Sequence, residues 1–329
     1  MNILVTGGMG LIGHNVVKLL QDQGHNVSIM DTHTTYGIIP QDELNYLMAE
    51  RYDKITTEDT YIYNDDIADA HAVRRIFEIE QPDIVIHMAS FPRQKVVNAN
   101  PSLGAKTMME GLLNLLETSK ANGIEKFVYI SSSMVYGDFD DQVTEDAPCD
   151  PIGQYGIMKL AGEHLVKDYS RRKCFSHTII RPSAVYGPLD VEDRVVAKFM
   201  LTAMRGETLK VNGAGETLDF TYSEDAAQGI VAATLSDNTH NKTYNITKSH
   251  SVSLLEAAQK IVSIVGQGKI DVRGKDADFP SRGALNIDAA RRDFGFDPKV
   301  DVEEGFHKYY EWLKNSTYWQ DKLNENSIH

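Results

Sequence analysis

The amino-acid sequence predicts an α/β fold, a doubly wound parallel sheet with helices on both faces. Short apolar runs alternate with longer amphipathic stretches, as they do where helical crossovers join parallel strands. Glycines follow the first apolar run at once, between a predicted strand and a predicted helix. The chain also lacks the internal repeats, coiled-coil heptads and low-complexity segments that would indicate another architecture.

The elements of the first half follow one another regularly. Continuous apolar runs predict strands buried on both faces, at Asn2–Thr6, Val27–Met30, Ile84–His87, Phe127–Ser131 and Thr178–Arg181. Helical spacing predicts helices over Leu11–Leu20, Val73–Ile79, Leu112–Ala121 and Tyr155–Arg172. Gly24 stands where a left-handed helix cap is expected.

The pattern changes after Arg181, where Pro182 and Gly187 break the chain. Beyond them we predict a helix over Val195–Arg205, a strand over Phe220–Tyr222 and two helices after Ser253. The second half is therefore expected to form a smaller lobe that interleaves with the main sheet. The predicted limits are 1–181 plus about 219–250 for the larger domain, and 182–218 plus 251–329 for the smaller lobe.

Composition excludes several classes of protein. The 329 residues carry a formal charge of −14, whereas a nucleic-acid-binding surface is basic and anionic membranes attract cations. No apolar run is long enough to span a membrane. The two cysteines, Cys149 and Cys174, indicate neither a disulfide framework nor a cysteine-based zinc site. MNILVTGG is a strand rather than a signal peptide, so we expect a cytoplasmic protein without metal, nucleic-acid or membrane partners.

The glycine-rich segment TGGMGLIG at 6–13 predicts a dinucleotide site. Glycines there permit a tight turn and let a pyrophosphate approach the backbone at the positive end of a helix. The contacting residues would be Gly7, Gly10, Leu11, Ile12 and Gly13. Asp31 lies about 20 residues after Gly10, the spacing of a ribose-binding acid. It favours NAD over NADP; the alternatives are an ordinary tight turn and a solvated strand-end acid.

Tyr155 and Lys159 form the candidate catalytic pair, together with Ser132. Their i,i+4 spacing on a helix places both side chains on one face. An ammonium about 4 Å from the phenol would contribute ~4 kcal/mol, so we expect Lys159 to lower the pKa of Tyr155 by ~3 units. A cationic nicotinamide ring would act in the same direction. Ser132 follows a predicted strand and could hydrogen-bond the reacting oxygen.

Seven motifs occur in order along nearly the whole chain: TGGMGLIG, HMAS, SSSMVYG, YGIMK, RPSAVYGP, LDFTYSED and RRDFGFDP. In this order they resemble an extended short-chain dehydrogenase/reductase of the NAD-dependent nucleotide-sugar epimerase/dehydratase family. The resemblance implies a Rossmann-type NAD-binding domain, a substrate-binding smaller lobe, and a homodimer formed by the helix carrying Tyr155 and the preceding long helix, about Ser102–Ala121.

The resemblance also assigns residues to the site. Those implied to contact NAD, beyond the glycine loop and Asp31, are Asp66, Ile67, Met88, Ala89, Ser90, Ser131, Tyr155, Lys159, Pro182 and Val185. Those implied to contact a nucleotide sugar are Ser132, Ser133, Tyr155, Ala184 and Arg282. For the apolar positions, plain core packing is the alternative interpretation.

The chemistry implied is 4-epimerisation through a transient keto sugar, with Tyr155 as the base. The family's dehydratases carry an Asp-Glu pair where this chain has Ser133 and Met134, which disfavours 4,6-dehydration. A net dehydrogenase or dehydratase releasing a keto sugar is the alternative, and a silent NAD-sensing protein is a third.

Three positions depart from the family pattern. Met108 and Ala184 replace asparagines, and Leu218 replaces an arginine that often clamps the pyrophosphate. Either another cation binds the phosphates, such as Lys95, Lys198, Arg205, Lys210 or Arg282, or the substrate is not a usual UDP-sugar. The acidic stretch from Asp138 to Asp150 is expected to be a solvated loop rather than a metal site.

Overall fold

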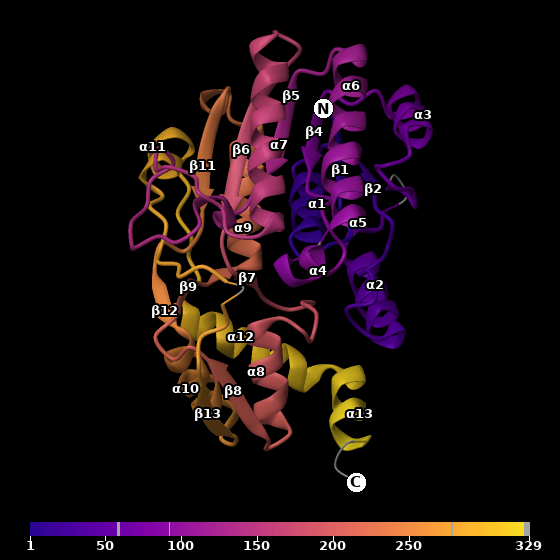
Figure 1. The fold of residues 1–329 in the computed structure, drawn as a ribbon. Helices are drawn as coiled ribbons and strands as arrows, with labels where there is room; N and C mark the ends of the chain where they lie inside the picture. Colours follow the sequence, from indigo (N-terminus) through magenta and orange to yellow (C-terminus); the bar gives the residue numbers. More distant parts are fainter. Residues whose placement is uncertain (58–59, 92, 278, 326–329) are drawn as a thin grey trace.

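The computed structural model describes residues 1–57, 60–91, 93–277 and 279–325, which form two lobes (Figure 1). A 7-stranded sheet in the order β11-β6-β5-β4-β1-β2-β3 forms the larger lobe. All its neighbouring strands pair in parallel. The strands are β1 (Asn2–Thr6), β2 (Asn26–Met30), β3 (Tyr61–Tyr63), β4 (Ile84–His87), β5 (Lys126–Ile130), β6 (Ser176–Pro182) and β11 (Lys242–Ile246). The predicted doubly wound α/β fold is confirmed.

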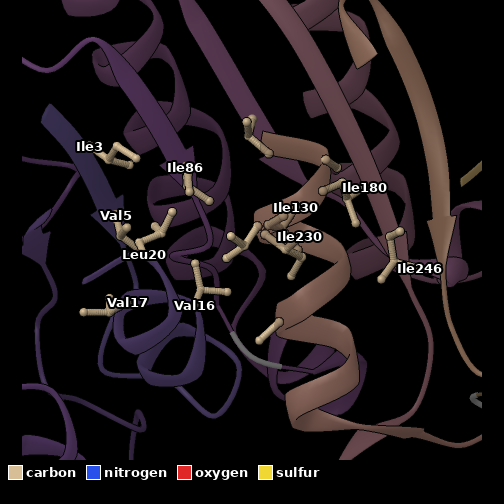
Figure 2. Close-up of a cluster of buried hydrophobic side chains, with 14 of the residues drawn as sticks. Ile3, Val5, Val16, Val17, Leu20, Ile86, Ile130, Ile180, Ile230 and Ile246 are labelled. Carbon is tan, nitrogen blue, oxygen red and sulfur yellow. The ribbon is translucent and has the colours of Figure 1, made fainter. Parts of the chain in front are cut away.

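Helices cover both faces of this sheet because side chains alternate between its faces. Ile3 and Val5 of β1 point to the face covered by α1 (Gly13–Asp22) and α9 (Ser223–Leu235), as Figure 2 shows. Leu4 points to the opposite face. The helices packed there are α3 (Ala70–Glu80), α6 (Gly111–Asn122) and α7 (Gln154–Arg171).

Further helices and turns lie between these elements along the chain. They are α2 (Gln41–Ile55), α4 (Gln94–Ala99), α5 (Pro101–Ala105), a π-helix over Lys106–Glu110, a 3₁₀ turn over Ser133–Tyr136, another over Asp237–Thr239, and α11 (Asp288–Phe294). The π-helix interrupts the one long helix that the resemblance implied over about Ser102–Ala121.

The smaller lobe lies below the sheet in Figure 1 and packs around its own apolar core. Its helices are α8 (Val195–Met204), α10 (Leu254–Val265), α12 (Val302–Asn315) and α13 (Thr317–Glu325). Three strand pairs complete it: β7 (Val185–Tyr186) with β10 (Thr221–Tyr222), β8 (Thr208–Asn212) with β13 (Lys269–Arg273), and β9 (Thr217–Asp219) with β12 (Ser251–Ser253). Edge-on contacts join Tyr186, Phe220 and Phe306 at its centre.

Several elements differ from the sequence prediction. The prediction of two helices after Ser253 is wrong, because four helices follow it. Helix α2 and strands β3, β8 and β13 were not predicted. Between the two halves of the smaller lobe, β11 returns to pair with β6 in the larger sheet. The residue limits of the lobes stay a prediction, and positions 326–329 lie outside the described residues.

Along the described ranges, none of the helices is long and apolar enough to cross a membrane.

Candidate active site

The glycine loop joins β1 to α1 at the carboxyl edge of the sheet. Gly7 has φ +74° and donates its N–H to the Met30 carbonyl at 2.9 Å. A Cβ atom at this position would lie 2.6 Å from the Ala89 nitrogen, and left-handed φ values already favour glycine. Glycine therefore lets the loop after β1 touch the loop after β4.

A cavity of about 210 Å³ opens where β1, β2 and β4 end. Chain order reverses between β1 and β4, and such switch points are where open α/β sheets bind ligands. The predicted residues that line the cavity are Gly7, Gly10, Leu11, Asp31, Asp66, Ile67, Met88, Ala89 and Ser90. The predicted cofactor residues outside this lining are Ile12, Gly13, Ser131, Tyr155, Lys159, Pro182 and Val185.

Asp31 is fixed at the end of β2 by two backbone N–H groups. Its Oδ2 accepts from Met9 at 3.0 Å and its Oδ1 accepts from His33 at 2.8 Å. The first bond ties the carboxylate to the glycine loop, and the second ties it to the opposite rim. A carboxylate held there can accept hydrogen bonds from a ribose.

The cavity lining contains four buried polar atoms that have no hydrogen-bond partner among the described residues: His33 Nε2, Arg51 Nε, Arg93 Nη2 and Asp190 Oδ2. Buried polar atoms ordinarily have partners. The lining therefore suits a ligand rich in donors and acceptors, and a dinucleotide fits that description together with Asp31 and the glycine loop.

The side chains of Ser132 and Ser90 act on the Tyr155 hydroxyl and lower its pKa, and Ser90 lines the cavity. Helix α7 reaches this place because Gly156 lets it approach the 3₁₀ turn closely: a Cβ atom at Gly156 would lie 2.6 Å from the Met134 carbonyl oxygen. The structure thus brings the predicted Ser132 and Tyr155 together, and it adds Ser90 as a second partner of the phenol.

The expected lowering of the Tyr155 pKa by Lys159 is wrong for this structure. Burial raises the pKa of Tyr155, and the charge of Arg194 and the two serine hydrogen bonds only partly offset it. The Lys159 Nζ lies 5.8 Å from the Tyr155 ring centroid and donates to the Ile130 carbonyl at 2.8 Å. Burial lowers the pKa of Lys159 to about 7, against the charge of Glu163.

Behind the site, a buried network fixes the end of β5 to α7 and β6. Ser131 donates to Glu163 Oε1 at 2.6 Å, and Arg181 clamps both Glu163 oxygens at 2.8 and 2.7 Å. Arg181 also donates to the Tyr136 hydroxyl at 2.8 Å. The Ser131 hydroxyl is therefore committed to this network, and any contact with a cofactor would come from its backbone.

The proposed substrate side contains one cation with an incomplete set of partners. Arg282 Nη1 lies 3.4 Å from the Met134 sulfur, and its Nε has no hydrogen-bond partner among the described residues. Burial lowers its pKa to about 10, and the Glu216 charge opposes this. Next to Met134, the Ser133 hydroxyl donates to Ser183 at 3.1 Å. Ala184 follows with φ +36°.

The acidic loop holds the segment that carries Arg282. Asp138 accepts from the Ser281 N–H at 2.7 Å, and Asp141 accepts from the Ala284 N–H at 2.6 Å. Phe139 and Gly283 exchange further backbone bonds with this segment. Asp138 and Asp141 are exposed, as the expectation of a solvated loop implies, and they also accept from backbone amides that hold the segment with Arg282.

The departures at Met108 and Leu218 both place an apolar side chain in a core. Met108 is buried with Phe91 and Val97 in a cluster that Tyr155 packs against. Leu218 is buried in the core of the smaller lobe. Leu218 therefore lies where a charged side chain would be costly, so a phosphate clamp has to come from elsewhere.

Sequence reasoning missed three arginines of the cavity: Arg51, Arg93 and Arg194. Arg51 lies on α2 and donates to the carbonyls of Met9 and Leu189 at 2.7 and 2.6 Å, so it joins the glycine loop to the smaller lobe. No motif or periodicity marks these positions. The arginine just before the predicted helix at 195–205 was the only available signal.

Comparison with known proteins gives a family match. The sequence matches the NAD-dependent epimerase/dehydratase family over residues 3–247. A dTDP-D-glucose 4,6-dehydratase of Mus musculus is 27% identical over 331 residues, spanning 97% of this chain and 90% of that protein.

Two solved structures resemble the fold closely. The UDP-glucose 4-epimerase of Thermotoga maritima, with UDP-glucose, has a TM-score of 0.84 and 27% identity. The UDP-glucuronic acid 4-epimerase of Bacillus cereus, in complex with UDP-glucuronic acid and NAD, has a TM-score of 0.88 and 26% identity. Each similarity covers 95% of this chain and 99% of the other.

Proposed function

Because the chain belongs to the NAD-dependent epimerase/dehydratase family, we propose that this enzyme is a nucleotide-sugar 4-epimerase. The observation that carries the proposal is the place of Tyr155, where the side chains of Ser132 and of the cavity residue Ser90 act on its hydroxyl and lower its pKa against the effect of burial. Solved relatives with UDP-glucose and with UDP-glucuronic acid and NAD support nucleotide sugars as the substrate class.

The chain's own residues supply proton transfer and orientation. A dinucleotide held by the glycine loop and Asp31 would supply the acceptor and donor of the hydride exchanged with the sugar carbon. Tyr155 takes the proton of the 4-hydroxyl, and Ser132 donates a hydrogen bond to the same oxygen as it becomes a ketone. Lys159 lies beside the phenol, with its Nζ 5.8 Å from the Tyr155 ring centroid, and its hydrogen bond to the Ile130 carbonyl holds it there. Re-reduction on the other face returns the proton from Tyr155 and gives the 4-epimer.

The side chains next to Ser132 favour epimerisation over dehydration. Loss of water needs groups that move a proton at the neighbouring carbons. Ser133 and Met134 are both buried, and neither is an acid or base at neutral pH. The partly buried Arg282 beside Met134 supplies a cation, which suits a phosphate of the sugar nucleotide.

The assembly that we propose is a homodimer through α6 and α7. Four exposed apolar side chains lie on or next to these helices in the sequence: Leu103 on α5, Leu113 on α6, Ile152 before α7 and Ile157 on α7. Exposed apolar patches mark protein contacts. Light scattering should give a dimer mass for the parent, and the double substitution Leu113→Lys with Ile157→Lys should give a monomer; a monomeric parent contradicts the proposal.

The test of the activity uses the purified enzyme with UDP-glucose, UDP-glucuronic acid and dTDP-glucose, with products identified by NMR. We expect a 4-epimer from a UDP-sugar without accumulation of NADH. Tyr155→Phe should lower turnover by roughly 100-fold or more and leave the affinity for NAD unchanged. A 4-keto-6-deoxy product, or NADH formed in step with turnover, would instead identify a dehydratase or a dehydrogenase.

A further inference from the structure

Two arginines from opposite lobes meet at the cavity next to the candidate catalytic tyrosine. Arg93 lies in the loop after β4, and Arg194 immediately precedes α8. Both line the same cavity as Ser90, whose side chain acts on the Tyr155 hydroxyl. The sequence motifs include neither arginine, and the proton transfer proposed above uses neither.

Both arginines have incomplete sets of partners. Arg93 Nη1 donates to the Asp193 carbonyl at 3.1 Å and pairs with the Asp193 carboxylate, but Arg93 Nη2 is buried without a partner among the described residues. Arg194 Nε lies 3.9 Å from Asp190 Oδ1, too far for a hydrogen bond. Unused guanidinium donors are what an anion would accept from.

The two positive charges also act on each other. Burial lowers the pKa of Arg93 and the charge of Arg194 lowers it further, whereas Asp193 and Asp190 oppose this. The side chain of Arg93 is 18% exposed and that of Arg194 is 45% exposed. The two aspartates therefore offset part of the repulsion, and an anion that accepts the unused donors would offset more of it.

The backbone at Arg93 is unusual. Arg93 has φ +66°, a left-handed conformation that is uncommon for residues with a side chain. Such conformations gather at ligand sites, where the surrounding structure holds them in place. Here the conformation precedes α4 and accompanies a side chain directed into the cavity lining.

We propose that Arg93 and Arg194 form an anion-binding clamp that closes across the two lobes on a phosphate or carboxylate group bound in the cavity. The anion has two possible sources, the dinucleotide pyrophosphate or an acidic group on the sugar. The proposal rests on the cavity being the ligand site of the proposed function, and it does not depend on which reaction follows.

The first experiment tests the pyrophosphate source with Arg93→Gln and Arg194→Gln. Binding of ADP-ribose and of adenosine is measured by calorimetry on protein freed of nucleotide. If the clamp takes the pyrophosphate, each variant binds ADP-ribose roughly tenfold or more weakly, because a charge-assisted contact is lost. Adenosine, which has no phosphate, binds as it does to the parent.

The second experiment tests the acidic-sugar source. The NAD-loaded variants and parent are titrated with UDP-glucuronate and UDP-glucose, which differ by one carboxylate. If the clamp takes that carboxylate, the parent prefers UDP-glucuronate and each variant loses roughly tenfold of the preference. In that case the affinity for ADP-ribose stays at the parent value.

Arg172→Gln is the matched control, since it also removes one arginine–aspartate pair but lies exposed at the end of α7. Arg194→Lys keeps the charge and should retain part of the affected affinity. Circular dichroism and thermal melts identify a variant that fails to fold. In that case the two binding experiments are made with Arg194→Lys instead. The clamp is refuted if neither affinity ratio differs from that of the control by more than about twofold. Both experiments measure binding, so a protein that binds these ligands without epimerising them contradicts only the proposed function.

Discussion

The carboxylate of Asp31 accepts N–H groups from Met9 and His33, and this fixes it before any nucleotide arrives. A carboxylate held by two amides has little freedom to turn away from a bound ribose. It would also repel a phosphate on the ribose 2′-oxygen. The preference for NAD over NADP is therefore a property that one side chain can alter.

Replacing Asp31 with arginine should shift the preference toward NADP. The expected change in the ratio of NAD to NADP affinities is roughly tenfold or more, because a repulsive contact becomes a charge-assisted one. Fluorescence titrations with both nucleotides measure the ratio. Asp22→Arg, at the exposed end of α1, controls for the change in net charge, and an unchanged ratio would remove Asp31 from the ribose site.

For single residues, the sequence indicated which side chains to select as site candidates, but it did not predict the pKa of Tyr155. Tyr155, Lys159 and Ser132 could be selected because i,i+4 spacing puts two side chains on one helix face. The pKa of Tyr155 could not be predicted, because it depends on burial by residues distant in the chain. The arginines of the cavity lie in loops and on α2, where no periodic pattern marks them.

Among the elements, the loop from 138 to 145 and the segment from 281 to 284 act as one unit. Hydrogen bonds from backbone amides to Asp138 and Asp141 hold the second segment against the first. Arg282 is carried by that segment to within reach of Met134. Distant parts of the sequence thus meet through side chain–backbone bonds that no local pattern foretells.

Removing one of these bonds should weaken substrate binding specifically. Asp141→Ala leaves the Ala284 N–H without its acceptor, so we expect the KM for a nucleotide sugar to rise by about fivefold, the equivalent of one hydrogen bond, with kcat and the affinity for NAD little changed. Steady-state kinetics and NAD titrations measure these values. Asp140→Ala is the matched control, and a fall in kcat with KM unchanged would argue against a positioning role.

The helix before α7 differs from the one that the family resemblance implied. Helical spacing predicted Leu112–Ala121 and the resemblance implied one long helix over about Ser102–Ala121, but a π-helix interrupts that helix at Lys106–Glu110. A π-turn shifts the side-chain register by one residue, and it brings Thr107 to the cavity and Met108 to the cluster beside Tyr155. Helix α2 was missed because charged side chains surround its few apolar positions.

Across the whole molecule, buried histidines link stability to pH. Burial lowers the pKa of His14 and His87 to about 3, and that of His177 to about 4. An unfolded histidine titrates near ~6.5. The unfolded chain therefore binds protons that the folded chain refuses, and the stabilising contribution is complete above ~6.5 and is lost as the pH falls toward 4.

His177→Gln should remove the part of this dependence that His177 carries. The variant should gain stability relative to the parent as the pH falls, by up to ~2 kcal/mol near pH 5. Urea unfolding at several pH values measures the difference. Burial raises the pKa of Glu43 to about 7 and that of Asp190 to about 6, and these two shifts make the protein more stable as the pH falls. The quantity to compare is therefore the difference in free energy of unfolding between variant and parent at each pH, rather than the parent curve alone. His307→Gln, on an exposed position of α12, should follow the parent; a constant difference would exclude the effect.

The place of β11 and α9 in the larger lobe has a consequence for how the chain is made. Val16, Val17 and Leu20 of α1 pack against Ala227, Ile230 and Val231 of α9, which leave the ribosome some two hundred residues later. During translation the apolar side of α1 stays exposed until α9 emerges from the ribosome, even though the central strands of the sheet have already been synthesised. A chaperone that shields this face, or a pause in synthesis that delays α9, would therefore decide how much polypeptide matures and how much aggregates.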